Sequence, residues 1–146
     1  MKNQETQSRF LPAGEISMFC EQVALILGSG VSLYDGIEAL CDNYKGTAYG
    51  ASFEAIDRAV KQTGSLHAAL QETRVFPPYV LQMAKIGEQT GKLDEIMSSL
   101  SAYYAREQRI RRSVQNAVVY PICLIIMMAV VIVVLVSKVL PIFQQV

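Results

Sequence analysis

The sequence has little of what most enzymes use for catalysis or metal binding. It contains one histidine, His67, and three widely spaced cysteines without a Cys-x-x-Cys pair, which are Cys20, Cys41 and Cys123. It also lacks the paired histidines of a metalloprotease helix, the phosphate-binding Gly-x-x-x-x-Gly-Lys loop and the Gly-x-Ser-x-Gly nucleophile motif. We therefore expect no enzymatic activity, no cofactor and no metal site. His67 is expected to be a surface or packing residue, and the cysteines are expected to be small apolar packing residues.

An excess of basic residues is also missing. The formal net charge is zero, and the chain up to Arg112 holds 12 basic and 13 acidic residues. Nucleic-acid-binding domains normally carry a basic surface, so this balance argues against nucleic acid as a partner.

No charged residue occurs between Arg112 and Lys138, and residues 117–136 form a long apolar run. A helix of that length extends over about 30 Å, which matches the hydrocarbon thickness of a bilayer. A buried helix of a soluble protein is the alternative, but it would normally be shorter and carry a polar stripe. We predict a transmembrane region over residues 113–140 with its core at 117–136, followed by a far-side tail over residues 141–146.

The charges on the two sides of this span are unequal. Only Lys138 follows the span, whereas four basic residues precede it, which are Arg106, Arg109, Arg111 and Arg112. Because basic residues tend to remain in the cytoplasm, we expect the N-terminal domain to be cytoplasmic and the C-terminus to lie across the membrane. The same arginines could contact anionic lipid headgroups or a specific partner.

Upstream of the span, apolar residues recur at the three- and four-residue spacing of helices that bury one face. The predicted helices cover residues 16–27, 32–44, 53–60 with an end near Gly64, 65–71, 77–90, and the segment from Lys92 onward. No alternating strand pattern is visible. Because short loops favour antiparallel neighbours, we predict an all-α fold with an antiparallel six-helix bundle over residues 15–112, whose last helix runs into the transmembrane helix. Residues 1–14 are expected to form a flexible N-terminal extension.

Glycine motifs mark the predicted reversals between helices. In two of them a leucine follows the glycine two positions later, as in Gly64 with Leu66 and Gly91 with Leu93. The third, Gly30 with Leu33, has one additional residue between the two. Ser32 and Asp35 form a plausible helix cap after the first reversal. Between Lys92 and Leu140 there is no glycine and one proline, Pro121, which could kink the helix at the membrane entrance. We therefore expect a rigid helical stalk of about 70 Å rather than a flexible linker.

Several of these motifs, in this order, resemble the type II secretion system F family. Residues 76–93 resemble its central motif through Phe76, Pro77, Gly87, Glu88, Gly91 and Leu93. Residues 19–40 resemble its opening motif through Phe19, Gly30 and Leu33, and Gly64 and Leu66 match an internal motif. Tyr120, Pro121 and Pro141 match positions that border the first span. The resemblance covers roughly residues 19–143.

The resemblance implies a non-enzymatic platform protein of the bacterial inner membrane, which couples a cytoplasmic assembly ATPase to movement of pilin or pseudopilin subunits. Its partners would be that ATPase, other inner-membrane platform proteins, pilins or pseudopilins, membrane lipid and further copies of itself. Type II secretion, type IV pilus and competence systems all fit. Typical members have two such cytoplasmic domains and three spans, so this chain would correspond to the first of each. A single-span membrane-anchored adaptor or regulatory protein is the alternative.

Glu88 belongs to the Gly-Glu pair of the central motif and has two interpretations. In the structural one, its carboxylate accepts hydrogen bonds that stabilise a turn. In the functional one, it contacts a partner such as the ATPase. The sequence leaves both open.

Overall fold

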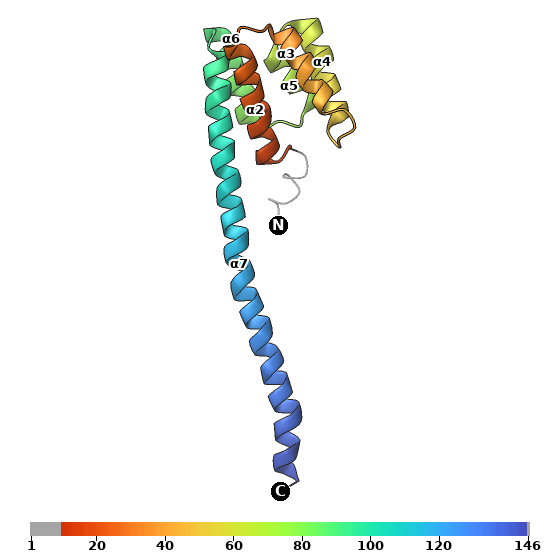
Figure 1. Cartoon of the computed structure of the whole chain (residues 1–146), viewed down its shortest axis with the longest axis vertical. Helices are drawn as coiled ribbons and strands as arrows, with labels where there is room; N and C mark the ends of the chain where they lie inside the picture. The colour runs from red at the N-terminus through yellow and green to blue at the C-terminus, as the bar shows by residue number, and fades with distance from the viewer. Residues whose placement is uncertain (1–9, 146) are drawn as a thin grey trace. The chain divides into compact units, whose positions relative to one another are not determined.

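The computed structural model of the chain describes residues 10–145. Within these residues it contains six α-helices and no β-strand (Figure 1). The helices are α2 (Ala13–Gly28), α3 (Leu33–Asn43), α4 (Gly50–Thr63), α5 (Leu66–Thr73), α6 (Pro78–Thr90) and α7 (Leu93–Gln144). The predicted all-α fold is confirmed, and so is the continuation of its last helix into the apolar segment.

The chain divides into two compact units, Met1–Gln108 and Arg109–Val146. The first unit holds α2 to α6 together with the start of α7, and the second holds the remainder of α7. The division falls slightly before residue 112, where the sequence placed the end of the bundle. The apolar residues 117–136 lie entirely in the second unit.

The first helix begins earlier than the sequence indicated. Residues 1–9 of the predicted flexible extension lie outside the described residues. Its remaining part is packed, because Leu11 is buried and its backbone N–H donates to the Val75 carbonyl at 2.8 Å. α2 then starts at Ala13 rather than at residue 15 or 16. The bundle therefore includes the last residues of the predicted extension.

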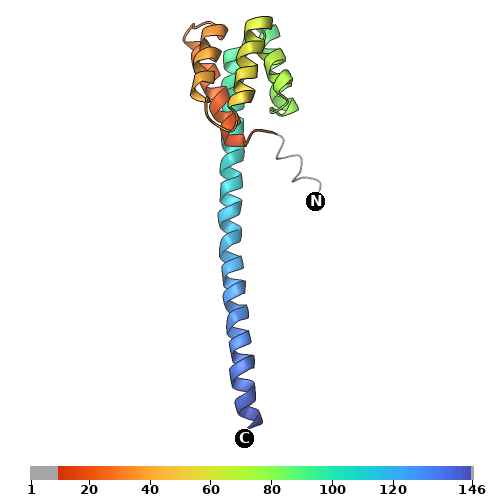
Figure 2. The ribbon, with the colours of Figure 1, turned by 90° about the vertical axis from the view of Figure 1, so that its right-hand side faces the viewer.

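Consecutive helices of the bundle run in opposite directions (Figures 1 and 2). Two reversals depend on a left-handed glycine, since φ is 69° at Gly64 and 71° at Gly91. A side chain makes such backbone angles unfavourable. The Ser32 hydroxyl caps α3, because its oxygen accepts from the Asp35 N–H at 3.3 Å and its proton is donated to the Asp35 carboxylate at 2.8 Å. This cap is the one predicted from the sequence.

α5 continues beyond the predicted end at residue 71 and ends at Thr73. The residue that terminates it is Arg74, which adopts a left-handed conformation with φ of 55°. Residues other than glycine rarely do so, which is why the sequence carried no signal for this boundary.

Three phenylalanines from different parts of the bundle form the centre of its core. Phe19 is fully buried, and its ring lies 5.6 Å from that of Phe53 and 5.2 Å from that of Phe76, between centroids. Tyr44 extends the cluster by stacking on Phe53 at 3.8 Å. Because aromatic rings bury much apolar area and prefer such offset or tilted contacts, this cluster joins α2, α3, α4 and the segment before α6.

The cysteines of the bundle have the packing role expected from the sequence. Cys20 and Cys41 are buried, and the Cys41 thiol donates to the Phe53 carbonyl at 3.0 Å. Burial is the main cause that raises the pKa of each thiol to about 12. Cys123 is exposed and lies in the second unit.

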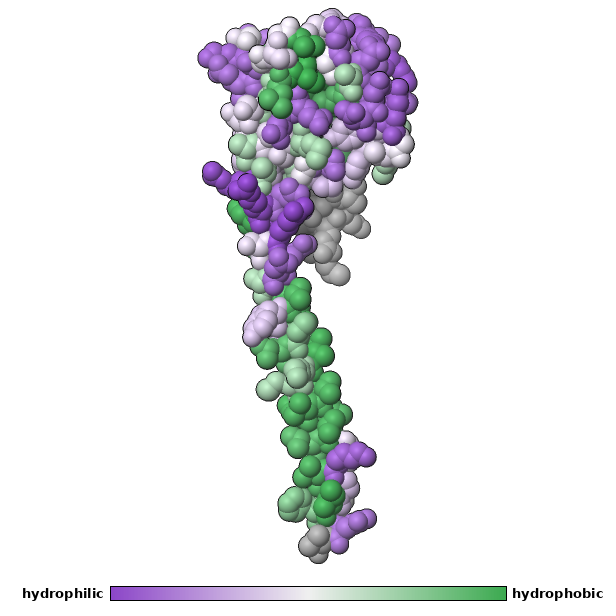
Figure 3. All heavy atoms as spheres, in the orientation of Figure 1, coloured by the Kyte–Doolittle hydropathy of each residue, from purple (hydrophilic) through white to green (hydrophobic). Residues whose placement is uncertain are grey.

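The described part of the second unit is one helix covered with hydrophobic side chains (Figure 3). α7 is the one helix among the described residues that is long and apolar enough to cross a membrane. Over residues 117–136 its apolar side chains are exposed rather than packed within the chain, which is unlike the core helix of a soluble protein. Pro121 and Pro141 are both accommodated inside the helix.

The turn between α6 and α7 predicts an effect of substituting Gly87. A Cβ at this position would lie 2.9 Å from Leu93 Cδ1 and 3.0 Å from Leu93 Cα, so backbone would have to move. We expect Gly87→Ala to destabilise the bundle by about 1–3 kcal/mol, as overpacked sites do. Gly28→Ala is the matched control, because no atom lies within 4 Å of its Cβ position and its φ is ordinary.

Urea unfolding of a Cys123→Ser chain measures this effect, with thiol labelling as the probe. Cys20 and Cys41 react slowly while they are buried, because few thiolates form below the raised pKa of about 12. Gly87→Ala should lower the urea midpoint of labelling, whereas Gly28→Ala should leave it unchanged or raise it slightly. Equal midpoints for the two variants would contradict the tight α6–α7 contact.

Candidate functional site

Most motif residues predicted from the sequence gather at one end of the bundle (Figures 1 and 2). This end, which we name the turn end, consists of residues 28–33, 64–67 and 87–93, and α7 begins there. Its predicted members are Gly30, Leu33, Gly64, Leu66, Gly87, Glu88, Gly91 and Leu93. The three reversals are thus one structural region, although up to sixty residues separate them in the sequence.

Glu88 connects two helices at the turn end. Its side chain extends from α6 to the first turn of α5, where Oε1 accepts hydrogen bonds from the backbone N–H groups of Leu66 and of His67, the latter at 3.2 Å. Oε2 accepts from the Ser65 hydroxyl at 2.8 Å. Ser65 is itself the N-cap of α5, since its oxygen accepts from the Ala68 N–H at 3.2 Å.

These contacts suit a negatively charged side chain. The first N–H groups of a helix have no partner within the helix and carry the positive end of its dipole. A carboxylate that accepts them forms charge-assisted hydrogen bonds, which are stronger than those between neutral groups. Glu88 therefore makes the kind of contact that its structural interpretation describes, in which the carboxylate accepts hydrogen bonds at a turn. Its side chain is half-buried, so part of it still faces solvent.

His67 adds a second link between the same two helices. Its ring Nδ1 lies 2.9 Å from the Leu81 carbonyl oxygen. A carbonyl can only accept, so the ring nitrogen is the donor and the tautomer with a proton on Nδ1 is fixed. His67 is thus a half-buried packing residue, one of the two roles expected for it.

Two residues in or next to the turn end were not among the motif residues predicted from the sequence. Ser65 is one, and the only signal for it was its position after Gly64. Tyr34 is the other: its hydroxyl oxygen lies 2.7 Å from the place that a Cβ on Gly64 would take. Gly64 is therefore constrained mainly by its positive φ, because the exposed Tyr34 side chain can move aside.

The remaining predicted residues lie elsewhere. Phe19 and Phe76 belong to the core, and Pro77 is the N-cap of α6. Tyr120, Pro121 and Pro141 lie in the second unit, where the Tyr120 side chain is 72% exposed. The structure therefore does not combine all the motif residues in a single site.

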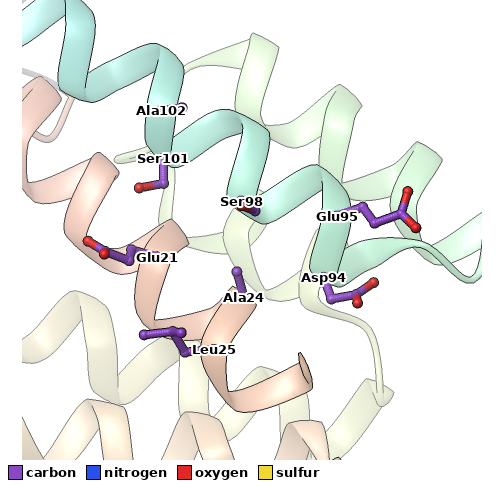
Figure 4. Close-up of a pocket in the computed structure, with 8 residues that line it drawn as sticks. All are labelled: Glu21, Ala24, Leu25, Asp94, Glu95, Ser98, Ser101 and Ala102. Carbon is purple, nitrogen blue, oxygen red and sulfur yellow. The ribbon is translucent and has the colours of Figure 1, made fainter. Parts of the chain in front are cut away.

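A cleft of about 550 Å³ lies between α2 and the start of α7 (Figure 4). It is lined by Glu21, Ala24, Leu25, Asp94, Glu95, Ser98, Ser101 and Ala102. Beside it, the buried Ser17 hydroxyl donates to the Ser101 carbonyl at 2.9 Å. Asp94 and Glu95 belong to the first turn of α7, and the packing of α2 brings Glu21 to the same cleft. Among the described residues, no three acidic, histidine or cysteine side chains are arranged to hold a metal ion.

Comparison with known proteins gives a consistent result over most of the chain. Residues 19–141 match the family model described as Type II secretion system (T2SS), protein F. The chain is 35% identical over 134 residues to the type IV pilus assembly protein PilC of Thermus thermophilus, covering 88% of this chain and 32% of that protein. The PilC of Myxococcus xanthus is 30% identical over 132 residues, or 90% of this chain and 32% of that protein.

A relative named for secretion is equally similar. The type II secretion system protein F of Aeromonas hydrophila is 31% identical over 130 residues, which cover 86% of this chain and 32% of that protein. The chain therefore spans about a third of the length of these relatives. Because the family match extends through the bundle and the apolar segment alike, the chain belongs to the type II secretion system F family.

Proposed function

We propose that the chain is a platform component of a machine that assembles type IV pili or the related filaments of type II secretion. In this role it couples a cytoplasmic assembly ATPase to movement of pilin or pseudopilin subunits in the membrane. The observation that carries the proposal is the family match over residues 19–141, which includes both the turn end and the apolar helix. Relatives named for pilus assembly and for secretion match about equally well, so the proposal covers both systems.

The proposed location is the bacterial inner membrane, with the bundle in the cytoplasm and residues 113–140 as the membrane region. Support comes from the exposed apolar surface of α7 after residue 117 and from the arginines that precede it. The proposed action is mechanical. α7 is helical from Leu93 to Gln144, and such a helix would transmit a displacement better than a flexible linker.

Glu88 is the proposed contact for the ATPase. A carboxylate offers about four acceptor positions, and the hydrogen bonds to the start of α5 use three of them. A lysine or arginine of a partner could therefore bind the remaining position on Oε2 while the cap of α5 stays intact. Further copies of the chain and other inner-membrane platform proteins are proposed as additional partners.

Removal of the bundle tests the platform role. Deletion of codons 15–112 in frame, in the source bacterium, should abolish surface filaments or secretion of exported proteins. Electron microscopy of cells and the protein content of the medium measure the two outcomes, and the Gly28→Ala strain serves as the control. Normal filaments and normal secretion in the deletion strain would instead favour an adaptor that acts in another process.

Substitution of Glu88 separates its two roles. Glu88→Gln keeps the shape but loses charge-assisted hydrogen bonds, so we expect a loss of about 1–2 kcal/mol in bundle stability. If Glu88 also contacts the ATPase, binding of the purified chain to that ATPase should weaken about tenfold or more at a temperature where the variant is fully folded.

Glu95→Gln provides the control for this measurement. Glu95 is exposed and pairs only weakly with Lys92 at 3.4 Å, so neither stability nor binding should change much. Reduced stability with unchanged ATPase affinity in Glu88→Gln would assign Glu88 a structural role alone.

Protease treatment tests the orientation. If the bundle is cytoplasmic, proteinase added to the outside of spheroplasts should leave it intact, and the same proteinase should digest it after the membrane is opened by detergent. Digestion of the bundle in closed spheroplasts, with a cytoplasmic marker protein still protected, would reverse the proposed orientation.

A further inference from the structure

α2 carries apolar residues on its outward side as well as on the side that faces the core. Its inward residues belong to the buried core, yet Met18 is 49% exposed and Leu25 is 66% exposed. Polar side chains occupy only four of its sixteen positions, which are Glu15, Ser17, Glu21 and Gln22. A helix that is apolar all round is normally covered on every side. The outward side of α2 therefore has the composition of an interface rather than of a free surface.

Met18 and Leu25 form a ridge with a hollow on each side. The two residues are two helical turns apart and lie on one face of α2, with Glu21 between them. On one side is the cleft of about 550 Å³ against α7, and on the other is a hollow of about 300 Å³ against α3. Leu25 lines both, together with Ala24 on the α7 side and Ala39 on the α3 side. A ridge between two hollows offers a partner helix both a knob to pack against and grooves to fill.

The surroundings of this ridge are negatively charged. Residues 10–108 hold 12 acidic and seven basic residues, a net charge of −5. Glu21 and Asp94 line the cleft, and Figure 4 shows their carboxylates toward its opposite ends. Neither has an ion pair with a basic side chain in the described part of the chain, whereas Glu95 pairs with Lys92 at 3.4 Å. None of the residues that line either hollow is basic.

These charges select among the molecules that the ridge can contact. A second copy of the chain, paired through the same face, would bring its own carboxylates against Glu21 and Asp94, and like charges at an interface oppose binding. Anionic lipid headgroups are repelled for the same reason. A protein helix that carries lysine or arginine residues beside its apolar residues is attracted by both the charge and the apolar surface.

We propose that the outward face of α2, from Met18 to Leu25, binds a basic amphipathic helix of a protein partner. The apolar side chains of that helix pack against Leu25 and fill the hollows beside it, and its lysine or arginine side chains lie opposite Glu21 and Asp94. This contact is separate from the one proposed for Glu88, whose hydrogen bonds are to the start of α5.

A fluorescent label on the ridge tests this contact in the full chain. Bimane is attached to Leu25→Cys in the Cys123→Ser chain, which is held in phosphatidylcholine nanodiscs. The probe is an 18-residue helical peptide of leucine, alanine and lysine, with leucines on one face and lysines along both borders of that face. We expect the peptide to shift the bimane emission to the blue, and to bind about tenfold or more tightly than the same peptide with glutamate in place of lysine. The affinity should decrease in 1 M NaCl.

Three pairs of substitutions identify the charges responsible. Glu21→Gln with Asp94→Asn should weaken binding of the lysine peptide about fivefold or more. Glu21→Lys with Asp94→Lys should reverse the preference, so that the glutamate peptide binds more tightly. Glu54→Gln with Glu72→Gln is the matched control, because it removes the same charge from exposed positions on α4 and α5, and it should change the affinity less than about twofold.

Several results would overturn the proposal. No binding of the lysine peptide, equal affinity for the two peptides, or an equal loss in the control pair would each show that the face of α2 does not select a basic helix. Bimane emission that is already shifted to the blue before peptide is added would show that lipid or a second copy of the chain covers Leu25 instead.

Discussion

The first turn of α5 depends on a side chain from another helix, and the arrangement of the turn end depends on that interaction. α5 has only eight residues, too few for a helix to be stable by itself in water. The Glu88 carboxylate accepts two of its otherwise unpaired N–H groups and holds the hydroxyl of its N-cap serine. Since Glu88 belongs to α6, the same hydrogen bonds hold α5 and α6 together.

Much of this architecture was predictable from local signals. The helices follow from apolar residues at helical spacing, and the reversals follow from Gly30, Gly64 and Gly91, all three of which have positive φ. The Ser32 cap was also predictable, because its partner Asp35 lies three residues away. In each case the interacting groups are neighbours in the sequence.

The features that were missed depend on contacts between distant residues. Ser65 and Glu88 are 23 positions apart, so their hydrogen bond has no sequence pattern. The buried Leu11 likewise donates its backbone N–H to the carbonyl of Val75, 64 positions away in the sequence. Arg74 ends α5 with a positive φ that glycine would normally supply. The candidate site was therefore recognised as a set of motif residues, but what those residues do for one another required the structure.

Ser17 has a consequence for how α7 is set against α2. Apolar contacts have no preferred direction, so a hydrogen bond between two helices adds a directional constraint to their packing. Ser17 is a buried polar residue, and its hydroxyl donates to the Ser101 carbonyl at 2.9 Å and lies 3.4 Å from the Ser101 hydroxyl. A rotation or one-turn slip of either helix would break that hydrogen bond, at a cost of about 0.5–1.5 kcal/mol. The hydrogen bond between Ser17 and Ser101 therefore helps to fix how α2 and the first four turns of α7 are rotated about their axes.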